Sequence, residues 1–112
     1  MNKVLIYKNA FDEEVKVKLI TDKYIYTDRL YLGIVDIEND ELYADLTVNL
    51  PTYSCDISSG YLDINNCRHV REFIEKYKLG EYAGVEVKSG FNKYPLYDFD
   101  IREIKKYCEI EI

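Results

Sequence analysis

The chain has 112 residues, of which 47% are hydrophobic and 32% are charged, and its net charge is −6. This length and composition indicate one folded domain over residues 1–112 and argue against an intrinsically disordered chain. No window approaches the ~18 uncharged apolar residues that a membrane span needs, and no secretory leader is recognisable. We therefore expect a soluble, cytoplasmic protein.

Negative charge is concentrated in the middle of the chain. No lysine or arginine lies between Arg29 and Arg68, whereas seven acids lie there: Asp36, Glu38, Asp40, Glu41, Asp45, Asp56 and Asp63. Residues 30–67 therefore carry −7, and the other 74 residues sum to +1 from 15 basic and 14 acidic side chains. A field of one sign steers basic partners toward it and repels nucleic acid and anionic lipid. We expect neither direct nucleic-acid binding nor a membrane partner.

The first half of the chain has the apolar and polar patterning of β-strands. Strands are predicted over residues 4–8, 14–19, 24–26, 30–37 and 41–50, with polar turns at Thr21-Asp22-Lys23 and Asn39-Asp40. Short polar turns join antiparallel neighbours. The pattern therefore predicts an antiparallel meander of about four to five strands.

The pairing of the last two predicted strands follows from their turn. With a two-residue turn at Asn39-Asp40, the numbers of facing residues sum to 79. One face is then wholly apolar, with the pairs Ile37/Leu42, Val35/Ala44, Gly33/Leu46 and Tyr31/Val48. The opposite face carries Glu38 against Glu41, Asp36 against Tyr43 and Ile34 against Asp45. This register predicts a hairpin whose tip is acidic on its outer side.

Helical spacing occurs in the second half of the chain. A first helix is predicted from Asn66, a suitable N-cap, with Gly80 as a left-handed C-terminal stop. A second is predicted from Asp100, where Glu103 completes a capping pair. A strand over residues 85–88 and a turn over residues 89–92 lie between them. The expected fold class is α+β, a meander followed by two short helices packed on one face.

The acidic hairpin tip is the first candidate functional site. Its five acids in residues 36–45 lie along ~17 Å of ribbon, a spacing of ~3.4 Å that matches the phosphates along one strand of duplex DNA. Like charges across a ladder are costly, and such local conflicts gather at functional sites. We assign partner contacts to Asp36, Glu38, Asp40, Glu41, Tyr43 and Asp45. The alternatives are a tip that only deters edge-to-edge aggregation and a divalent-metal site.

Support for catalysis is weak, and we expect no enzyme activity and no cofactor. His69 is the only histidine, and no nucleophile motif accompanies it, although Cys55 and Asp56 could in principle join it. Residues 86–88 match a three-residue nuclease pattern that occurs by chance in charged chains. The three cysteines, Cys55, Cys67 and Cys108, lack CxxC spacing and indicate idle thiols in a reducing compartment.

Several short motifs resemble those of a known family. They are Leu46-Thr47-Val48-Asn49-Leu50, Asp63-Ile64-Asn65-Asn66, Phe73-Ile74 with Leu79-Gly80, and Ser89-Gly90-Phe91 followed by Tyr94-Pro95-Leu96-Tyr97. Over about residues 42–100 the chain is similar to short acidic proteins of unknown function from plasmids, conjugative elements and prophages of low-GC Gram-positive bacteria. That family has no assigned catalytic residues, so the resemblance transfers none.

The resemblance implies a biological setting for the charge. Small acidic proteins of mobile elements are often inhibitors of host defence, including anti-CRISPR and anti-restriction proteins that imitate DNA phosphates. We therefore expect a non-enzymatic protein-binding module whose partner is a basic, nucleic-acid-handling defence enzyme. The alternatives are a small metal-dependent enzyme that uses carboxylates such as Asp36 and Asp45, and an accessory subunit of a conjugation or replication complex. Residues 89–97, shaped by Gly90 and Pro95, are a second candidate contact or a structural turn.

Overall fold

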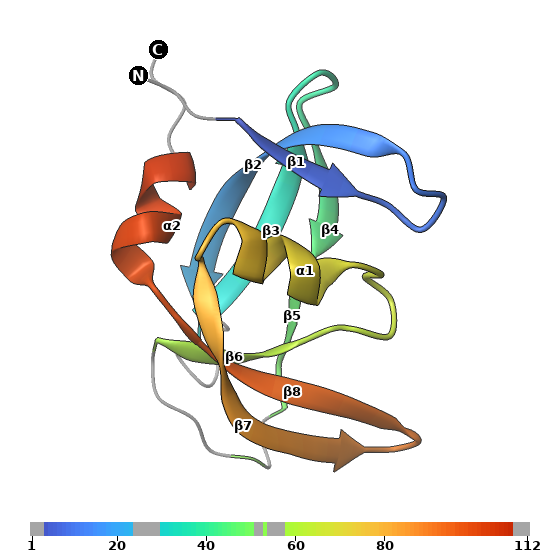
Figure 1. Cartoon of the computed structure of the whole chain (residues 1–112), viewed down its shortest axis with the longest axis vertical. Coiled ribbons are helices and arrows are strands. Elements are labelled where there is room, and N and C mark those ends of the chain that lie inside the picture. Colours follow the sequence, from blue (N-terminus) through green and yellow to red (C-terminus); the bar gives the residue numbers. More distant parts are fainter. Residues whose placement is uncertain (1–3, 24–29, 51–52, 54–57, 109–112) are drawn as a thin grey trace.

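A computed structural model describes residues 4–23, 30–50, 53 and 58–108 (Figure 1). Within these residues the elements are β1 (Leu5–Lys8), β2 (Glu14–Lys23), β3 (Leu30–Asp36), β4 (Glu41–Asp45), β5 (Thr47–Val48), β6 (Ser59–Leu62), α1 (Val70–Lys76), β7 (Gly80–Ser89), β8 (Asn92–Phe99) and α2 (Ile101–Cys108). The strands form two antiparallel sheets. The expected α+β class is confirmed.

The first sheet is the predicted meander, in the order β1-β2-β3-β4. β2 continues through Thr21-Asp22-Lys23, whose residues pair with residues 30–32 of β3. The turn predicted at Thr21-Asp22-Lys23 is therefore wrong, because backbone pairing with β3 outweighs the turn preference of these polar residues. The strand predicted at residues 24–26 lies outside the described residues.

The pairing of β3 with β4 differs from the predicted register. The observed pairs are Gly33/Asp45, Ile34/Ala44, Val35/Leu42 and Asp36/Glu41. The connecting turn has four residues, 37–40, and a bulge leaves Tyr43 without an opposite residue on β3. The predicted apolar face is also wrong: Leu32 and Ile34, placed on the opposite face, are wholly buried in the core, whereas Leu42 is 56% exposed.

The first sheet curls so that its edge strands β1 and β4 approach each other. The rings of Tyr7 and Tyr43 meet edge to face with centroids 6.2 Å apart. Asn9 at the end of β1 donates a hydrogen bond from Nδ2 to the Tyr43 hydroxyl at 3.1 Å. The curl encloses apolar side chains that are wholly buried, among them Leu5, Val17, Leu19, Leu32 and Ile34.

Leu46 joins the two sheets between β4 and β5. Its N–H donates to the carbonyl of Leu32 in the first sheet at 2.9 Å, and its carbonyl accepts from the N–H of Asp63 at 2.9 Å. The side chain of Leu46 is itself wholly buried. One continuous segment therefore serves both sheets at the centre of the core.

The second sheet has the order β5-β6-β8-β7. β6 and β8 were not predicted from the sequence. Every residue of β6 is buried, so it lacks the alternation that marks a half-exposed strand. β8 contains Pro95, which argues against a strand in a sequence-based assignment. The predicted turn at residues 89–92 is confirmed as the two-residue connection of β7 and β8, because Ser89 pairs with Asn92.

The first helix, α1, begins later than predicted. Its N-cap is His69, which has a φ of 68° and makes no side-chain capping bond. Asn66 instead closes the preceding turn, where its N–H and Nδ2 donate to the carboxylate of Asp63 at 3.2 and 3.0 Å. Because Asn66 is hydrogen-bonded to Asp63 in this turn, it does not cap the helix. α1 packs against β1 and β7 (Figure 1).

Gly80 does not end α1 as predicted. The left-handed residue after the helix is Lys78, with a φ of 57°, and Gly80 is the first residue of β7. A Cβ at Gly80 would lie 2.8 Å from the carbonyl oxygen of Asp98. Glycine is therefore needed there because β7 and β8 approach each other closely.

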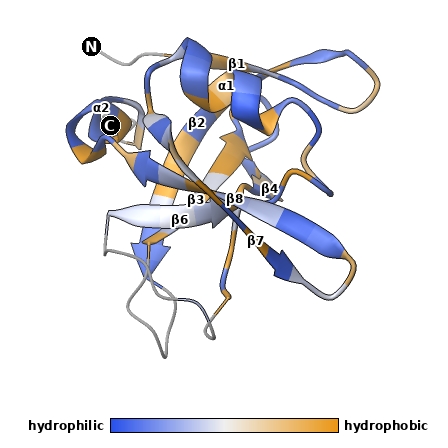
Figure 2. Ribbon diagram, turned by 60° about the horizontal axis from the view of Figure 1, so that its bottom comes forward, coloured by the Kyte–Doolittle hydropathy of each residue, from blue (hydrophilic) through white to orange (hydrophobic). Residues whose placement is uncertain are grey.

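The second helix, α2, begins as predicted. The N–H of Glu103 donates to Oδ1 of Asp100 at 3.1 Å, which confirms the cap. Ile104 is wholly buried, and the helix packs against β2. Figure 2 shows the mixture of hydrophilic and hydrophobic residues that both helices carry, as expected for helices lying on a core.

Candidate functional site

The turn between β3 and β4 is built around the carboxylate of Asp36. Its Oδ1 accepts a hydrogen bond from the N–H of Glu38, and its Oδ2 accepts one from Nδ2 of Asn39, both at 2.9 Å. The hydrogen bond from the Asn39 side chain is the main reason that the pKa of Asp36 lies below its usual value. Asp36 in its charged form therefore shapes the turn.

Three further carboxylates lie at the same end of the hairpin. Asp40 has a φ of 55°, and its Oδ1 is 3.9 Å from Nζ of Lys18 on β2. Glu38 and Glu41 are exposed, and among the described residues neither carboxylate has an ion pair or a hydrogen bond. Glu41 faces Asp36 across the ladder, so this like-charged pair replaces the predicted pair of Glu38 and Glu41. We call Asp36, Glu38, Asp40 and Glu41 the acidic turn.

Tyr43 and Asp45 lie apart from the acidic turn. The bulge directs Tyr43 toward Tyr7 and Asn9 of β1, so its predicted position among the acids is wrong. Asp45 is exposed and accepts a hydrogen bond from the hydroxyl of Tyr31. The structure thus gathers four of the six predicted contact residues. A role for any of the six in binding a partner stays a prediction.

Asp63, another acid of the acidic stretch, does not extend this surface. It is only 7% exposed, and its carboxylate is bonded to Asn66 in the turn before α1. Asp56 lies outside the described residues, as does Cys55. Among the described residues, the solvent-facing charge of the stretch is therefore concentrated in the acidic turn, with Asp45 separate from it.

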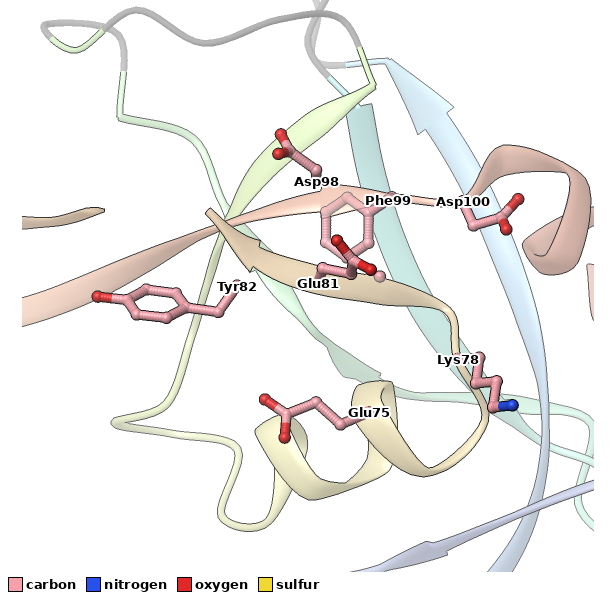
Figure 3. A pocket seen from close by; sticks show the side chains of 8 residues that line it. Glu75, Lys78, Glu81, Tyr82, Asp98, Phe99 and Asp100 are labelled. Carbon is pink, nitrogen blue, oxygen red and sulfur yellow. The ribbon is translucent and has the colours of Figure 1, made fainter. Parts of the chain in front are cut away.

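A second concentration of carboxylates surrounds a hollow of about 690 Å³ (Figure 3). Its lining comes from α1, the connection from α1 to β7, the start of β7, the end of β8 and the residue before α2: Glu75, Lys78, Gly80, Glu81, Tyr82, Asp98, Phe99 and Asp100. Four carboxylates against one lysine make this site negative as well. We call it the acidic hollow.

Three of the four carboxylates in the acidic hollow are held by neighbouring groups. Asp98 accepts a hydrogen bond from the hydroxyl of Ser59 at 2.5 Å, Asp100 caps α2, and Glu75 accepts from the hydroxyl of Tyr97. Glu81 has no side-chain partner among the described residues, and it faces Asp98 across the ladder. Glu81 is therefore the most available charge of the hollow.

A buried tyrosine and an arginine fix the position of Glu75. Nε of Arg71 donates to the Tyr97 hydroxyl at 3.0 Å, and its guanidinium lies 4.8 Å from the ring centroid of Tyr82. Burial is the main cause that raises the pKa of Tyr97, and the hydrogen bond to Tyr97 is the main cause that raises the pKa of Arg71. This network keeps one wall of the acidic hollow rigid.

The acidic hollow was not predicted from the sequence. Glu75, Glu81 and the pair Asp98 and Asp100 come from separate segments, which only the pairing of β7 with β8 and the docking of α1 bring together. The one local signal was the sequence Asp98-Phe99-Asp100, where two acids flank a buried aromatic ring.

His69, considered above as a catalytic candidate together with Cys55 and Asp56, has structural contacts, as does the thiol of Cys67; Cys55 and Asp56 lie outside the described residues. His69 has Nδ1 2.9 Å from Oε1 of Glu72 and Nε2 3.1 Å from Oδ1 of Asp12, so it joins α1 to the β1–β2 turn. Sγ of Cys67 donates to the carbonyl of Asp45 at 3.2 Å, and burial raises the pKa of this thiol to about 11. A thiol of that pKa is not an activated nucleophile near neutral pH.

The described residues contain neither a metal-binding cluster nor a helix that could span a membrane. No group of three or more His, Cys, Asp or Glu side chains in them is arranged to hold a metal ion. Asp36 and Asp45 do not form a carboxylate pair, because Asp36 faces Glu41 and Asp45 faces Gly33. Across the same part of the chain, no helix is long and apolar enough to cross a membrane.

Comparison with known proteins assigns the chain to a family. The model of the family described as domain of unknown function (DUF4313) matches residues 18–112. The chain belongs to the DUF4313 family. The matched region of this DUF4313 chain contains both the acidic turn and the acidic hollow. No curated protein and no solved structure matches the chain. The expected relation to a family of unknown function is confirmed.

Proposed function

We propose that this DUF4313 protein is a binding module that presents its acidic turn to a basic groove of a protein that handles nucleic acid. The observation that carries the proposal is the exposure of Glu38 and Glu41, which have no ion pair among the described residues. They lie in a stretch of the chain that contains no lysine or arginine. Like charges held close together cost stability, and a cationic partner relieves that cost.

The density of charge in the acidic turn suits a groove that otherwise holds nucleic acid. Its four carboxylates belong to six consecutive residues, 36–41. A DNA strand likewise presents closely spaced negative charges, one per ~3.4 Å of axis. The hydrogen bonds of Asp36 hold the turn in shape before a partner arrives, which lowers the entropic cost of binding.

In the more specific form of the proposal, the partner is a host-defence enzyme such as a CRISPR or restriction nuclease. The protein acts in the cytoplasm as an inhibitor, does not itself catalyse a reaction and needs no cofactor. Support comes from the motifs that resemble proteins of plasmids, conjugative elements and prophages of low-GC Gram-positive bacteria, and from a net charge of −6, which disfavours contact with nucleic acid itself.

Affinity capture from a lysate of such a bacterium tests the proposal. The bait proteins are the wild type and the double variant Glu38→Gln with Glu41→Gln, which changes the net charge from −6 to −4. We expect the wild type to recover a basic nucleic-acid enzyme and the variant to recover much less of it. Raising the salt concentration should weaken capture, because exposed ion pairs are screened.

The matched control is Asp22→Asn with Glu86→Gln. It also changes the net charge from −6 to −4, but it alters exposed residues of β2 and β7 outside the acidic turn. We expect this control to recover the partner as well as the wild type does. Equal recovery of the partner by all three proteins would reject the role of the acidic turn. Equally poor recovery by both variants would show that capture depends on net charge and not on the acidic turn.

A further inference from the structure

The tip of the β7–β8 hairpin carries basic and aromatic side chains. Phe91, in the two-residue turn, is 100% exposed. Lys88 and Lys93 face each other across the ladder beside that turn, and neither has an ion pair with a described residue. Facing lysines repel each other. We call Lys88, Phe91 and Lys93 the hairpin tip.

The hairpin tip is held in place by the body of the protein. The hydroxyl of Tyr53 donates to the carbonyl of Lys88 at 2.6 Å, and Nδ2 of Asn65 donates to the carbonyl of Lys93 at 3.3 Å. Both strands are therefore anchored at the residues that carry the lysine side chains. Figure 1 shows the hairpin extending away from the helices, with its turn at the outer end.

The opposite end of the same hairpin is acidic, whereas the hairpin tip is basic. There Glu81 faces Asp98 across the ladder, a second like-charged pair but of negative sign. These two residues line the acidic hollow beside Phe99 and Gly80 (Figure 3). The hollow thus combines carboxylates with an apolar ring, and its volume of about 690 Å³ has room for a phenyl ring and the apolar stems of lysines.

We propose that two copies of this chain associate by placing the hairpin tip of each in the acidic hollow of the other. The tip and the hollow lie at opposite ends of one hairpin, so two hairpins side by side in antiparallel orientation make both contacts at once. Such an exchange is a closed, two-fold symmetric arrangement, which does not grow into a filament. In it, the facing lysines of one copy meet Glu81 and Asp98 of the other, and both repulsive pairs are relieved.

The position of β7 is compatible with this arrangement. β7 is an edge strand of the second sheet, and its residues Tyr82 and Val85 are 42% and 47% exposed. Its pairing with β8 shifts between Tyr82 and Glu86, and Gly84 there has a φ of 85°. Such an irregularity discourages a continuous ladder between two copies of β7. We therefore assign the association to the hairpin tip and the acidic hollow.

The association should be weak and sensitive to salt. Each contact consists of one exposed turn in one open hollow, and weak complexes are those with interfaces below ~1,200 Å², so a dissociation constant on the order of 0.1 mM is expected. Ion pairs at an exposed rim are screened as salt rises. The proposal does not depend on the acidic turn, so its failure would leave the proposed function untouched.

Sedimentation equilibrium of the full chain, from about 0.01 to about 1 mM protein, tests the proposal. We expect the wild type to shift from monomer to dimer over this range at about 0.05 M salt, and less so at about 0.5 M salt. Phe91→Ser should weaken dimerisation at least about tenfold, as loss of a central aromatic contact does. The control is Phe11→Ser, which removes a ring that is 83% exposed at the β1–β2 turn and should change nothing.

A charge-exchange experiment makes the test specific. Lys88→Glu with Lys93→Glu gives an acidic tip, and Glu81→Lys with Asp98→Lys gives a hollow with three lysines against two carboxylates. Each variant alone should stay monomeric, because its tip and its hollow then carry charge of the same sign. In an equimolar mixture each tip again meets a hollow of opposite sign, so the mixture should form dimers. All of the altered side chains are exposed, and a cooperative thermal transition verifies that each variant folds.

Four results would overturn the proposal. One is a wild-type protein that is monomeric at every concentration. Another is a dimer that Phe91→Ser leaves intact. The third is a mixture of the charge variants that stays monomeric. Binding of the monomeric wild type, but not of Phe91→Ser, to vesicles of phosphatidylglycerol would overturn it too and would assign the hairpin tip to an anionic lipid surface.

Discussion

Tyr31 lies across Gly33 on the outer face of the first sheet and donates a hydrogen bond from its hydroxyl to Asp45. A Cβ at Gly33 would lie 2.9 Å from Cζ of the Tyr31 ring. The absence of a side chain at position 33 therefore makes room for the ring, which in turn covers the exposed backbone of β3. The side chain of Tyr31 therefore connects β3 to β4 at the Gly33/Asp45 pair.

Gly33→Ala should lower the free energy of unfolding by about 1–3 kcal/mol, because the added methyl group displaces the Tyr31 ring. Urea unfolding measures the change. In a Tyr31→Ala background the same substitution should cost at least about 1 kcal/mol less, since no ring is left to displace. Equal costs in the two backgrounds would show that the contact between residues 31 and 33 does not limit the size of residue 33.

The hydroxyl of Tyr97 joins Arg71 to Glu75 in the wall of the acidic hollow. Tyr97→Phe keeps the buried ring but removes both hydrogen bonds, so we expect a loss of about 1–3 kcal/mol in the free energy of unfolding. Tyr82→Phe is the matched control. It keeps the ring below the Arg71 guanidinium and should cost less than about 0.5 kcal/mol. Similar losses in both variants would contradict a special role for the buried hydroxyl.

Burial of Cys67 predicts a loss of stability at high pH. Desolvation, followed by the charges of Asp63 and Asp45, raises the pKa of the thiol from 9.0 to about 11. The unfolded thiol therefore loses its proton first. Below about pH 9 both states are protonated and the stability is unaffected, whereas between about pH 9 and 11 the free energy of unfolding falls.

Cys67→Ala should make that decline shallower in urea unfolding experiments between about pH 9 and 11. Part of the decline should remain at the upper end of the range, because burial also raises the pKa of Tyr7. Identical slopes for the wild type and Cys67→Ala would show that the thiol ionises with equal ease in the folded and unfolded states.

The turn around Asp36 predicts a measurable shift in ionisation. The pKa of Asp36 should lie below the usual aspartate value, and removal of the strongest donor in Asn39→Ala should raise it toward that value. Carboxyl chemical shifts followed by NMR during acid titration report this directly. As pH falls through the pKa of folded Asp36, the turn loses the charged acceptor that holds it, so amide protection at Glu38 should decrease.

Much of the fold could be predicted from local patterns, because local interactions decide those elements. The meander of the first sheet follows from alternation, and the start of α2 follows from the capping of Asp100. The β7–β8 turn follows from the turn residues around Gly90. In each case the residues that carry the signal also make the deciding contact.

Other features depend on local hydrogen bonds that the pattern did not indicate, or on contacts between residues that are distant in the sequence. The register of β3 and β4 was wrong because Asp36 organises a four-residue turn and Tyr43 bulges toward β1. The start of α1 was wrong because Asp63 holds Asn66 in the preceding turn. The acidic turn could be predicted because its four acids lie within six consecutive residues, 36–41. The acidic hollow could not, because its carboxylates come from separate segments.

The most direct test of the proposed function is competition with DNA for the captured partner. Fluorescence anisotropy of a labelled duplex bound to that enzyme reports displacement as the protein is added. The wild type and the Asp22→Asn, Glu86→Gln control should displace the duplex alike, and Glu38→Gln with Glu41→Gln should require at least about tenfold more protein. A duplex that stays bound in the presence of saturating wild-type protein would contradict the claim that the acidic turn occupies a basic groove.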